Sequence, residues 1–296
     1  MTDANSTVGT LARLQSLALI TLSGEDRVSF LQGQLTNDVT KLGEALMRAG
    51  YCSPKGRLLA TPRLFKEGET IGMIVAADQA AAIAKRLKMY VLRSKVTVTL
   101  DETRELFGYL GKAPEALPQG CRVFAMADAK VEACIGAALP RGLGIIAAPK
   151  GSLEANTAEA LWWAASAAAG EPWVFAKTAD RFTAHAVNLD LAHGVSFNKG
   201  CYTGQEVVSR IEHIGKTNRR TIAAALAKPE TLEAGCDLTD AEGAVFATVV
   251  YAAALADRTL MLAEVASTIA EADGPLESTL GTLHRLPLPY GWTRTN

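Results

Sequence analysis

Paired cysteines are missing from this sequence. Its five cysteines form no Cys-x-x-Cys pair, and their number is odd. Disulfide frameworks, zinc sites and iron–sulfur centres each draw on grouped cysteines, so the pattern supports none of the three. We therefore expect no permanently bound metal. Free, scattered cysteines are typical of a reducing compartment, which favours a cytoplasmic protein.

Strong charge and long apolar runs are also missing. Lysine plus arginine number 30 and aspartate plus glutamate 31, for a net charge of -1. Proteins that bind nucleic acid by neutralising phosphates usually carry a positive balance, so direct nucleic-acid binding is not expected. No apolar run reaches the roughly twenty residues that cross a bilayer. The N-terminus has no basic region followed by an apolar core, so neither a membrane span nor a secretory signal is expected.

Short strands and helices mix in the first 220 residues without a repeating strand-helix-strand period. Apolar alternation and turn residues predict strands at residues 17–22, 58–65, 71–75 and 95–100. Helical periodicity predicts helices from Ser23, at residues 78–90 and at about 152–169. The mixture indicates an α+β body with mainly antiparallel sheet.

The pattern changes after Arg220. Four short strand candidates are separated by Gly, Asp and Pro turns: residues 221–226, 244–251, 259–265 and 279–286. Such a series predicts a small β-barrel or sandwich. We therefore divide the chain into an α+β body at residues 1–220 and a C-terminal β-barrel domain at residues 221–296. No low-complexity linker separates them, so close packing is expected.

One run concentrates reactive, charged and flexible residues: Lys199-Gly200-Cys201-Tyr202-Thr203-Gly204-Gln205-Glu206. Thr203 and Glu206 fit a capping box, which predicts a helix that begins at Thr203 and buries Val207, Val208 and Ile211. Cys201 would then lie just before the positive end of that helix, with Lys199 two residues away. Both features favour thiolate over thiol. A small, buried and inert cysteine is the alternative.

Two further groups near this run leave alternatives open. Lys216, Arg219 and Arg220 form a basic cluster, which is either a solvated helix end or an anion pocket. A histidine is a possible base for Cys201, although solvated or core histidines are commoner. The four histidines are His185, His193, His213 and His284.

The cysteine run also resembles a known signature. The pattern Lys-Gly-Cys-Tyr-x-Gly-Gln-Glu, followed by Arg210, resembles that of the YgfZ-type family, the folate-binding relatives of the glycine cleavage system T protein. The resemblance extends over nearly the full length through Phe30-Leu31-Gln32-Gly33-Gln34-Leu35-Thr36-Asn37-Asp38-Val39, Lys55-Gly56-Arg57, residues 90–96, Gly194-Val195-Ser196-Phe197, Gly215-Lys216 and Arg219-Arg220.

This resemblance implies ferredoxin-like α+β units around a central channel of folate size, followed by a C-terminal β-barrel. It also implies tetrahydrofolate or a derivative as ligand and a role in iron–sulfur cluster assembly or repair. The implied partners are cluster-assembly proteins and radical enzymes, including those that methylthiolate tRNA. The functional thiol would be Cys201, with Lys199, Tyr202, Gln205 and Glu206 around it. The folate-channel candidates are Gln32, Asn37, Asp38, Arg57, Arg210 and Arg220.

The sequence departs from the family at three places. Where the T protein carries acidic residues that act on the folate nitrogen, this chain has Leu59-Ala60, so proton transfer lacks an obvious agent. Ala184-His185 replaces a common Pro-Gln pair, and Ala168 replaces a common acidic residue. The first change favours an accessory protein over a tetrahydrofolate-dependent one-carbon transferase. The other two keep a third hypothesis open, a non-catalytic scaffold for cluster-assembly proteins.

Overall fold

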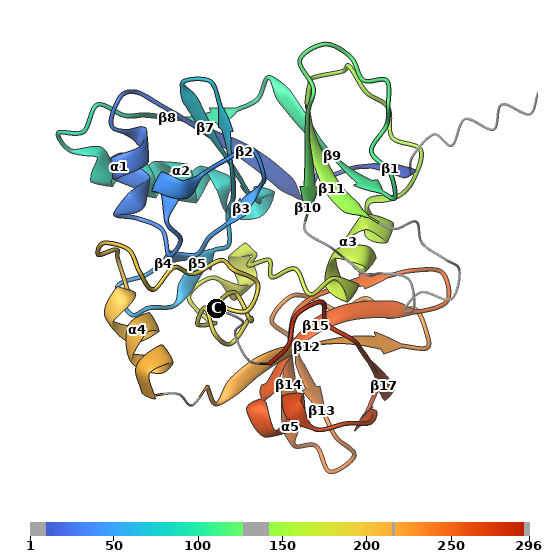
Figure 1. The fold of residues 1–296 in the computed structure, drawn as a ribbon. Helices are drawn as coiled ribbons and strands as arrows, with labels where there is room; N and C mark the ends of the chain where they lie inside the picture. Colours follow the sequence, from blue (N-terminus) through green and yellow to red (C-terminus); the bar gives the residue numbers. More distant parts are fainter. Residues whose placement is uncertain (1–9, 127–141, 215–216, 293–296) are drawn as a thin grey trace, which may run out of the picture.

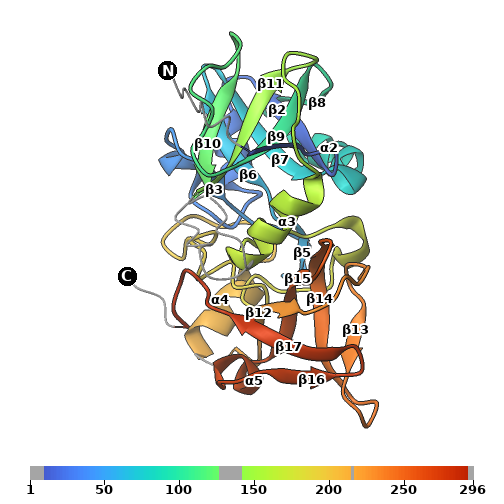
Figure 2. The same ribbon diagram turned by 90° about the vertical axis from the view of Figure 1, so that its right-hand side faces the viewer.

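The computed structural model describes residues 10–126, 142–214 and 217–292. Its strands form three antiparallel sheets and a short hairpin, with few helices between them, so the predicted α+β fold is confirmed. Figure 2 shows two sheets at the top of the molecule, the third at the bottom and helix α3 between them. Within the described ranges, no helix is both long and apolar enough to cross a bilayer.

The first sheet has five strands in the order β3-β6-β7-β2-β8. Helices α1 (Arg27–Gln32) and α2 (Ala77–Val91) share a core with one of its faces. Alternate residues of a strand point to opposite faces, so Ile20 and Leu22 join this core while Leu19 belongs to a second, central core. The strands are β2 (Leu17–Ser23), β3 (Met47–Arg48), β6 (Arg63–Glu67), β7 (Thr70–Ala76) and β8 (Thr97–Asp101).

The second sheet has four strands in the order β1-β9-β11-β10, namely β1 (Thr10–Arg13), β9 (Arg104–Leu110), β11 (Leu143–Pro149) and β10 (Arg122–Met126). Helix α3 (Glu159–Ala168) packs between this sheet and the third one. Trp162 of α3 donates its indole N-H to the Gly144 carbonyl at 3.1 Å. A Cβ at Gly108 would lie 2.2 Å from the Trp162 ring, so this glycine makes room for the indole.

The third sheet has six strands in the order β13-β14-β15-β12-β17-β16 and curls into a half-barrel. The Thr279 N-H, in the β16–β17 turn, donates to the Thr239 carbonyl of β13 at 2.9 Å, so one backbone bond joins the two ends of the sheet. The elements of this region are β12 (Arg219–Leu226), β13 (Asp237–Thr239), β14 (Val245–Ala254), β15 (Thr259–Ala266), α5 (Ser267–Glu271), β16 (Leu276–Ser278) and β17 (Gly281–Leu286). The domain division at residue 220 stays a prediction, and β12 runs across it.

Several element boundaries differ from the sequence-based expectations. The helix expected from Ser23 begins at Arg27, because Gly24 has a φ of +103° that is incompatible with a helix. The strand expected at residues 58–65 is split into β5 (Leu58–Ala60) and β6. The long helix expected at about 152–169 is confined to α3. The 3₁₀ turns η1 (Val39–Lys41) and η2 (Ala176–Thr178) complete the elements outside the site.

A buried ion cluster connects these parts. The Glu171 carboxylate accepts hydrogen bonds from Arg48 Nε at 2.9 Å and from Arg63 Nη2 at 2.8 Å. The Tyr251 hydroxyl of β14 donates to the Glu171 carbonyl at 2.9 Å. Burial alone would raise the pKa of the Glu171 carboxyl, but the two guanidiniums outweigh burial and lower it to about 2. One carboxylate therefore ties β3 and β6 to the chain that follows α3, where its backbone meets the barrel.

Replacing Glu171 by glutamine should leave two buried cations without their counter-charge. We expect a loss of about 3 kcal/mol in the free energy of unfolding at neutral pH, measured by urea denaturation. The native pKa lies below the reference value of 4.5, so the carboxylate stabilises fully above that pH and loses its contribution as the pH falls towards about 2. The variant should lack this loss. Glu242→Gln, which changes an exposed carboxylate, is the control, and an equal effect of both changes would contradict the prediction.

Candidate functional site

The loop that carries Cys201 leads into helix α4 (Gln205–Ile214). The helix begins at Gln205 and not at Thr203, because Gly204 has a φ of +83°. The Tyr202 N-H donates to the Gln205 side-chain oxygen at 3.3 Å, and the Gln205 N-H donates to the Tyr202 carbonyl at 3.1 Å. The predicted capping box of Thr203 and Glu206 is therefore wrong, and Tyr202 with Gln205 closes the helix start instead.

The outward and inward faces of α4 largely follow the prediction. Val208 is fully buried, and Arg210 is exposed. Val207 and Ile211 are only partly buried, and Glu206 is exposed in the first turn. Figure 1 shows α4 beside the hairpin of β4 (Tyr51–Cys52) and β5.

Lys199 holds this loop to the first sheet region. Its ammonium donates to three backbone carbonyls, those of Gln32 at 2.7 Å, Leu35 at 2.6 Å and Asn37 at 2.9 Å. Burial lowers the pKa of Lys199 to about 8, so the group is still mostly protonated at neutral pH. The ammonium also lies 5.0 Å from the centre of the Tyr202 ring. Its three donors are thus used within the fold, and an effect of Lys199 on the Cys201 thiol stays a prediction.

The carbonyls that receive Lys199 belong to a segment whose own side chains fix its shape. Gln32 donates to the Asp38 carboxylate at 2.9 Å, and the same oxygen accepts the Thr40 hydroxyl at 2.6 Å. Asn37 donates to the Arg48 carbonyl at 2.7 Å. Hydrogen bonding to Thr40 lowers the pKa of Asp38. Gln32, Asn37 and Asp38, proposed from the sequence as folate contacts, therefore serve here to shape the loop that binds Lys199.

The other side of the loop touches the β4–β5 hairpin. A Cβ at Gly204 would lie 2.5 Å from the Ser53 carbonyl oxygen, and a Cβ at Gly56 would lie 2.5 Å from the Val207 side chain. Both residues also have a positive φ. Glycine is therefore required at each of the two positions, by the close packing and by the backbone conformation. A Cβ at Gly200 would meet nothing within 4 Å, so no close contact within the fold requires a glycine there.

Cys201 itself is exposed, which excludes the alternative of a buried, inert residue. Cys52 is buried in the hairpin beneath Gly204, and burial raises the pKa of its thiol to about 12.

Among the described residues, no histidine hydrogen-bonds to the Cys201 sulfur, so the structure does not form the cysteine–histidine pair considered above. Cys134 lies outside the described residues.

His185 and Arg220 belong to a separate cluster. The His185 ring lies 3.4 Å from the Glu212 carboxylate of α4, and burial lowers the pKa of the imidazole. Arg220 donates to Asp190 at 2.7 Å, and Arg219 donates to Glu264 of β15 at 2.6 Å. The basic cluster is therefore neutralised by carboxylates at two of its positions; the third, Lys216, lies outside the described residues. His185, Asp190 and Glu212 converge within 4.8 Å.

Two folate candidates remain on the surface. Arg57 and Arg210 are exposed, and Arg57 donates to the Arg181 carbonyl. The structure thus joins Lys199, Tyr202 and Gln205 with the Gln32 segment in one site. Arg220 lies in the other cluster.

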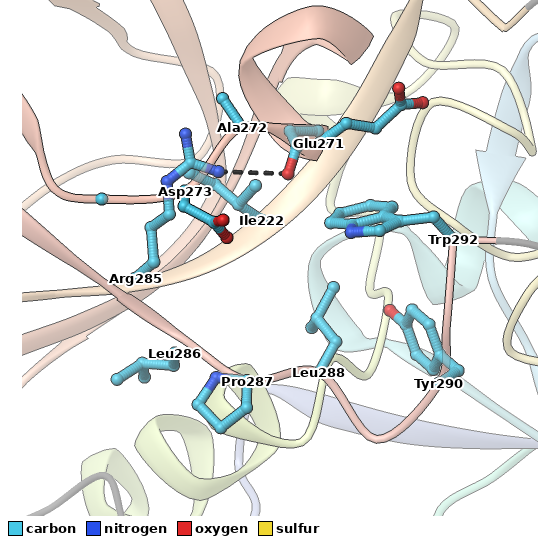
Figure 3. Close-up of a pocket in the computed structure, with 12 residues that line it drawn as sticks. Ile222, Glu271, Ala272, Asp273, Arg285, Leu286, Pro287, Leu288, Tyr290 and Trp292 are labelled. Atoms are coloured by element: carbon cyan, nitrogen blue, oxygen red, sulfur yellow. Dashed lines mark hydrogen bonds between the residues drawn. The ribbon is translucent and has the colours of Figure 1, made fainter.

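A pocket of about 340 Å³ was not predicted from the sequence. It lies between the end of α5 and the chain that follows β17, and none of the sequence-predicted site residues lines it. Figure 3 shows the Trp292 and Tyr290 rings on one side and Asp273 with Arg285 on the other. Tyr290 donates its hydroxyl to the Gly170 carbonyl at 2.9 Å, next to Glu171 of the ion cluster. The Pro287–Tyr290 turn pattern was visible in the sequence, but nothing there indicated which surface it would cover.

The three carbonyl contacts of Lys199 give a direct test. Lys199→Met should lower the free energy of unfolding by about 3 kcal/mol, because three part-buried carbonyl acceptors lose a charged donor. Amide hydrogen exchange at residues 33–41 should accelerate as well. Lys55→Met, at an exposed lysine of the hairpin turn, is the control and should change neither quantity. Unchanged exchange in the Lys199→Met variant would show that this side chain does not hold the loop.

Comparisons with known proteins agree with this architecture. No family model matches the chain. The tRNA-modifying protein YgfZ of Escherichia fergusonii is 29% identical over 304 residues, which cover 95% of this chain and 93% of that protein, and YgfZ of Escherichia coli K12 gives the same values. The solved aminomethyltransferase T of the glycine cleavage system from Bartonella henselae superposes with a TM-score of 0.69 at 18% identity, covering 97% of this chain and 87% of that one. The chain is thus a relative of the YgfZ-type proteins and has the fold of aminomethyltransferase T.

Proposed function

We propose that this protein is a folate-binding accessory factor for iron–sulfur enzymes, including those that methylthiolate tRNA, and that Cys201 is its functional thiol. The relatives are named tRNA-modifying proteins, which supports a role connected with tRNA modification. The observation that carries the proposal is the exposure of Cys201 between two anchored neighbours. Lys199 is bound to three carbonyls and Tyr202 is buried, so the thiol is presented to solvent from a fixed backbone.

The exposed thiol of Cys201 suits transient contact with a partner. Cys52, which lies beneath the loop, is buried and its raised pKa keeps it protonated, so it is a poor resolving thiol. Cys201 would act as a temporary ligand for a cluster or form a mixed disulfide with a client protein. Both roles require exposure, and neither requires a second cysteine of this chain.

We place the folate in the 340 Å³ pocket instead of at the candidates chosen from the sequence. Pockets of roughly 300–1,000 Å³ with aromatic walls and a few polar groups are typical of small-molecule sites. Figure 3 shows the Asp273 carboxylate and the Trp292 indole bordering the same space. Arg285 Nε is buried and has no hydrogen-bond partner in the described part of the chain. Trp292 and Tyr290 would flank the pterin, and Asp273 would accept its N-H groups.

Turnover of the folate is not part of this proposal. Bound tetrahydrofolate supplies a carrier nitrogen for one-carbon units. Strand β5 consists of Leu58, Leu59 and Ala60, with both outer residues buried, so it offers no carboxylate for proton transfer to that nitrogen. The protein's own groups would bind and orient the folate, which favours an accessory factor over a one-carbon transferase.

The role of the thiol can be tested in cells that lack the protein. Cys201→Ala should fail to restore methylthiolated tRNA, measured by mass spectrometry of tRNA nucleosides, although it should fold normally because the side chain is exposed. Cys236→Ala, at a partly buried cysteine of the barrel region, is the matched control and should restore the modification. Full restoration by Cys201→Ala would exclude a chemical role for this thiol.

Folate binding is tested separately by calorimetry with 5-formyltetrahydrofolate. Asp273→Asn and Trp292→Ala should each weaken binding about tenfold, because each removes a group that borders the pocket. Glu242→Gln, at an exposed carboxylate between β13 and β14, should leave the affinity unchanged. Equal affinity of all four proteins would place the folate elsewhere, and absence of heat at high micromolar ligand would refute folate binding itself.

A further inference from the structure

The near-zero net charge conceals a separation of charge along the chain. Between Asp78 and Asp101 the sequence has five basic residues and no acidic one. The chain has 30 basic and 31 acidic residues in all, so the rest of the chain holds 25 basic residues and all 31 acidic ones. The segment at residues 79–100 is thus strongly positive on a protein that is otherwise negative.

This segment comprises most of α2, the turn after it and most of strand β8. Ile83, Ala84 and Leu87 are buried against the first sheet, so the remaining faces of the helix point outward. Figure 1 shows the connection from α2 to β8 at the left margin of the molecule. We define the α2 patch by six exposed residues, which are Lys85, Lys88, Tyr90, Leu92, Arg93 and Lys95.

Helix stability alone does not explain the α2 patch. A lysine in the last turn of α2 interacts favourably with the helix dipole, which accounts for Lys88. Arg93 and Lys95 lie beyond the helix. Leu92 is 87% exposed and has a φ of +43°, a conformation that is costly for a residue other than glycine. The fold therefore maintains an exposed apolar side chain in a strained turn, without packing to compensate.

The chemistry of the α2 patch fits a nucleic-acid backbone. The Arg86 guanidinium lies 5.6 Å from the centre of the Tyr90 ring, and Tyr90 is 38% exposed, so this aromatic side chain is partly accessible for stacking on a base. Thr97 and Thr99 project from β8, which is an edge strand of its sheet, and their exposed hydroxyls can donate to phosphate. Lysine is depleted in protein–protein interfaces, and three of the five cations here are lysines.

We propose that the α2 patch binds the phosphate backbone of RNA. Its lysines and arginines neutralise phosphates, and Tyr90 stacks on a base or ribose. Lys95 also forms an ion pair with Glu25, but both side chains are exposed, so the pair is weak and a phosphate can replace it. The inference does not depend on folate or on Cys201, because it rests on charge and exposure in another part of the molecule. It reverses the expectation from net charge, since neutralisation of phosphates depends on the local field.

The test is fluorescence anisotropy with a labelled, unmodified tRNA transcript at several salt concentrations. Joint replacement of Lys85, Lys88, Arg93 and Lys95 by glutamine should weaken binding at least about tenfold and should reduce the salt dependence by roughly one unit of slope for each phosphate that the variant no longer neutralises. The four side chains are exposed, so the variant should fold like the parent protein. Joint replacement of Lys66, Lys112, Lys177 and Lys228, which are also exposed, is the charge-matched control.

Two further measurements separate RNA from other anionic partners. Tyr90→Ala should weaken binding at fixed salt without changing the slope, because it removes stacking and no charge. Equal binding by the two quadruple variants, or no binding of the transcript by the parent protein at low salt, would overturn the proposal. Competition by poly-L-glutamate as strong as that by tRNA at equal charge would also overturn it, since the patch would then be a docking site for an acidic protein.

Discussion

The buried carboxylate of Glu171 is the interaction on which the rest of the structure depends. It neutralises Arg48 and Arg63 from the first sheet, while its carbonyl accepts the Tyr251 hydroxyl from the barrel region. Arg63 also lies over the Trp173 ring at 3.8 Å, which links the charges to the aromatic core around α3. Two guanidiniums and one carboxylate are costly to bury singly, and here the carboxylate pairs with both cations where the first sheet meets the barrel region. The first sheet and the barrel region are thus joined by polar contacts as well as by apolar packing.

The loop that carries Cys201 is also held in place by a partly buried cation. The Lys199 side chain points into the fold, and its ammonium donates to backbone carbonyls instead of carboxylates. A charge-assisted hydrogen bond to a neutral carbonyl fixes the position of the loop and needs no acidic partner. The reactive and charged residues of the signature therefore divide into a support, formed by Lys199, Tyr202 and Gln205, and two exposed groups, the Cys201 thiol and the Glu206 carboxylate.

The sequence predicted the fold class, the four longer strands of the C-terminal sheet and the site loop, because short-range periodicity and the signature pattern encode them. The three-residue strands β13 and β16 are too short to show a periodicity and were missed. It placed the start of α4 two residues early, since the positive φ of Gly204 outweighed the capping pattern. Gln32 and Asn37 were assigned to folate through the family resemblance. The Asn37 amide also donates to the His193 carbonyl, a partner 156 residues away that no local pattern predicts. The carboxylate expected at residue 168 is absent, but Glu171 stands three residues later, and only the fold reveals its two arginine partners.

The Lys199 anchor also has a consequence for biosynthesis. Its ammonium joins carbonyls that precede it by 162 to 167 residues, so the α1 segment leaves the ribosome long before its partner is made. Closing so long a loop is entropically costly, so we expect these contacts to form late in folding. The thiol loop therefore acquires its fixed backbone only when the first sheet is already in place. A truncated or misfolded chain would carry Cys201 without the Lys199 contacts that hold its loop. The site is therefore complete only when most of the chain has folded correctly.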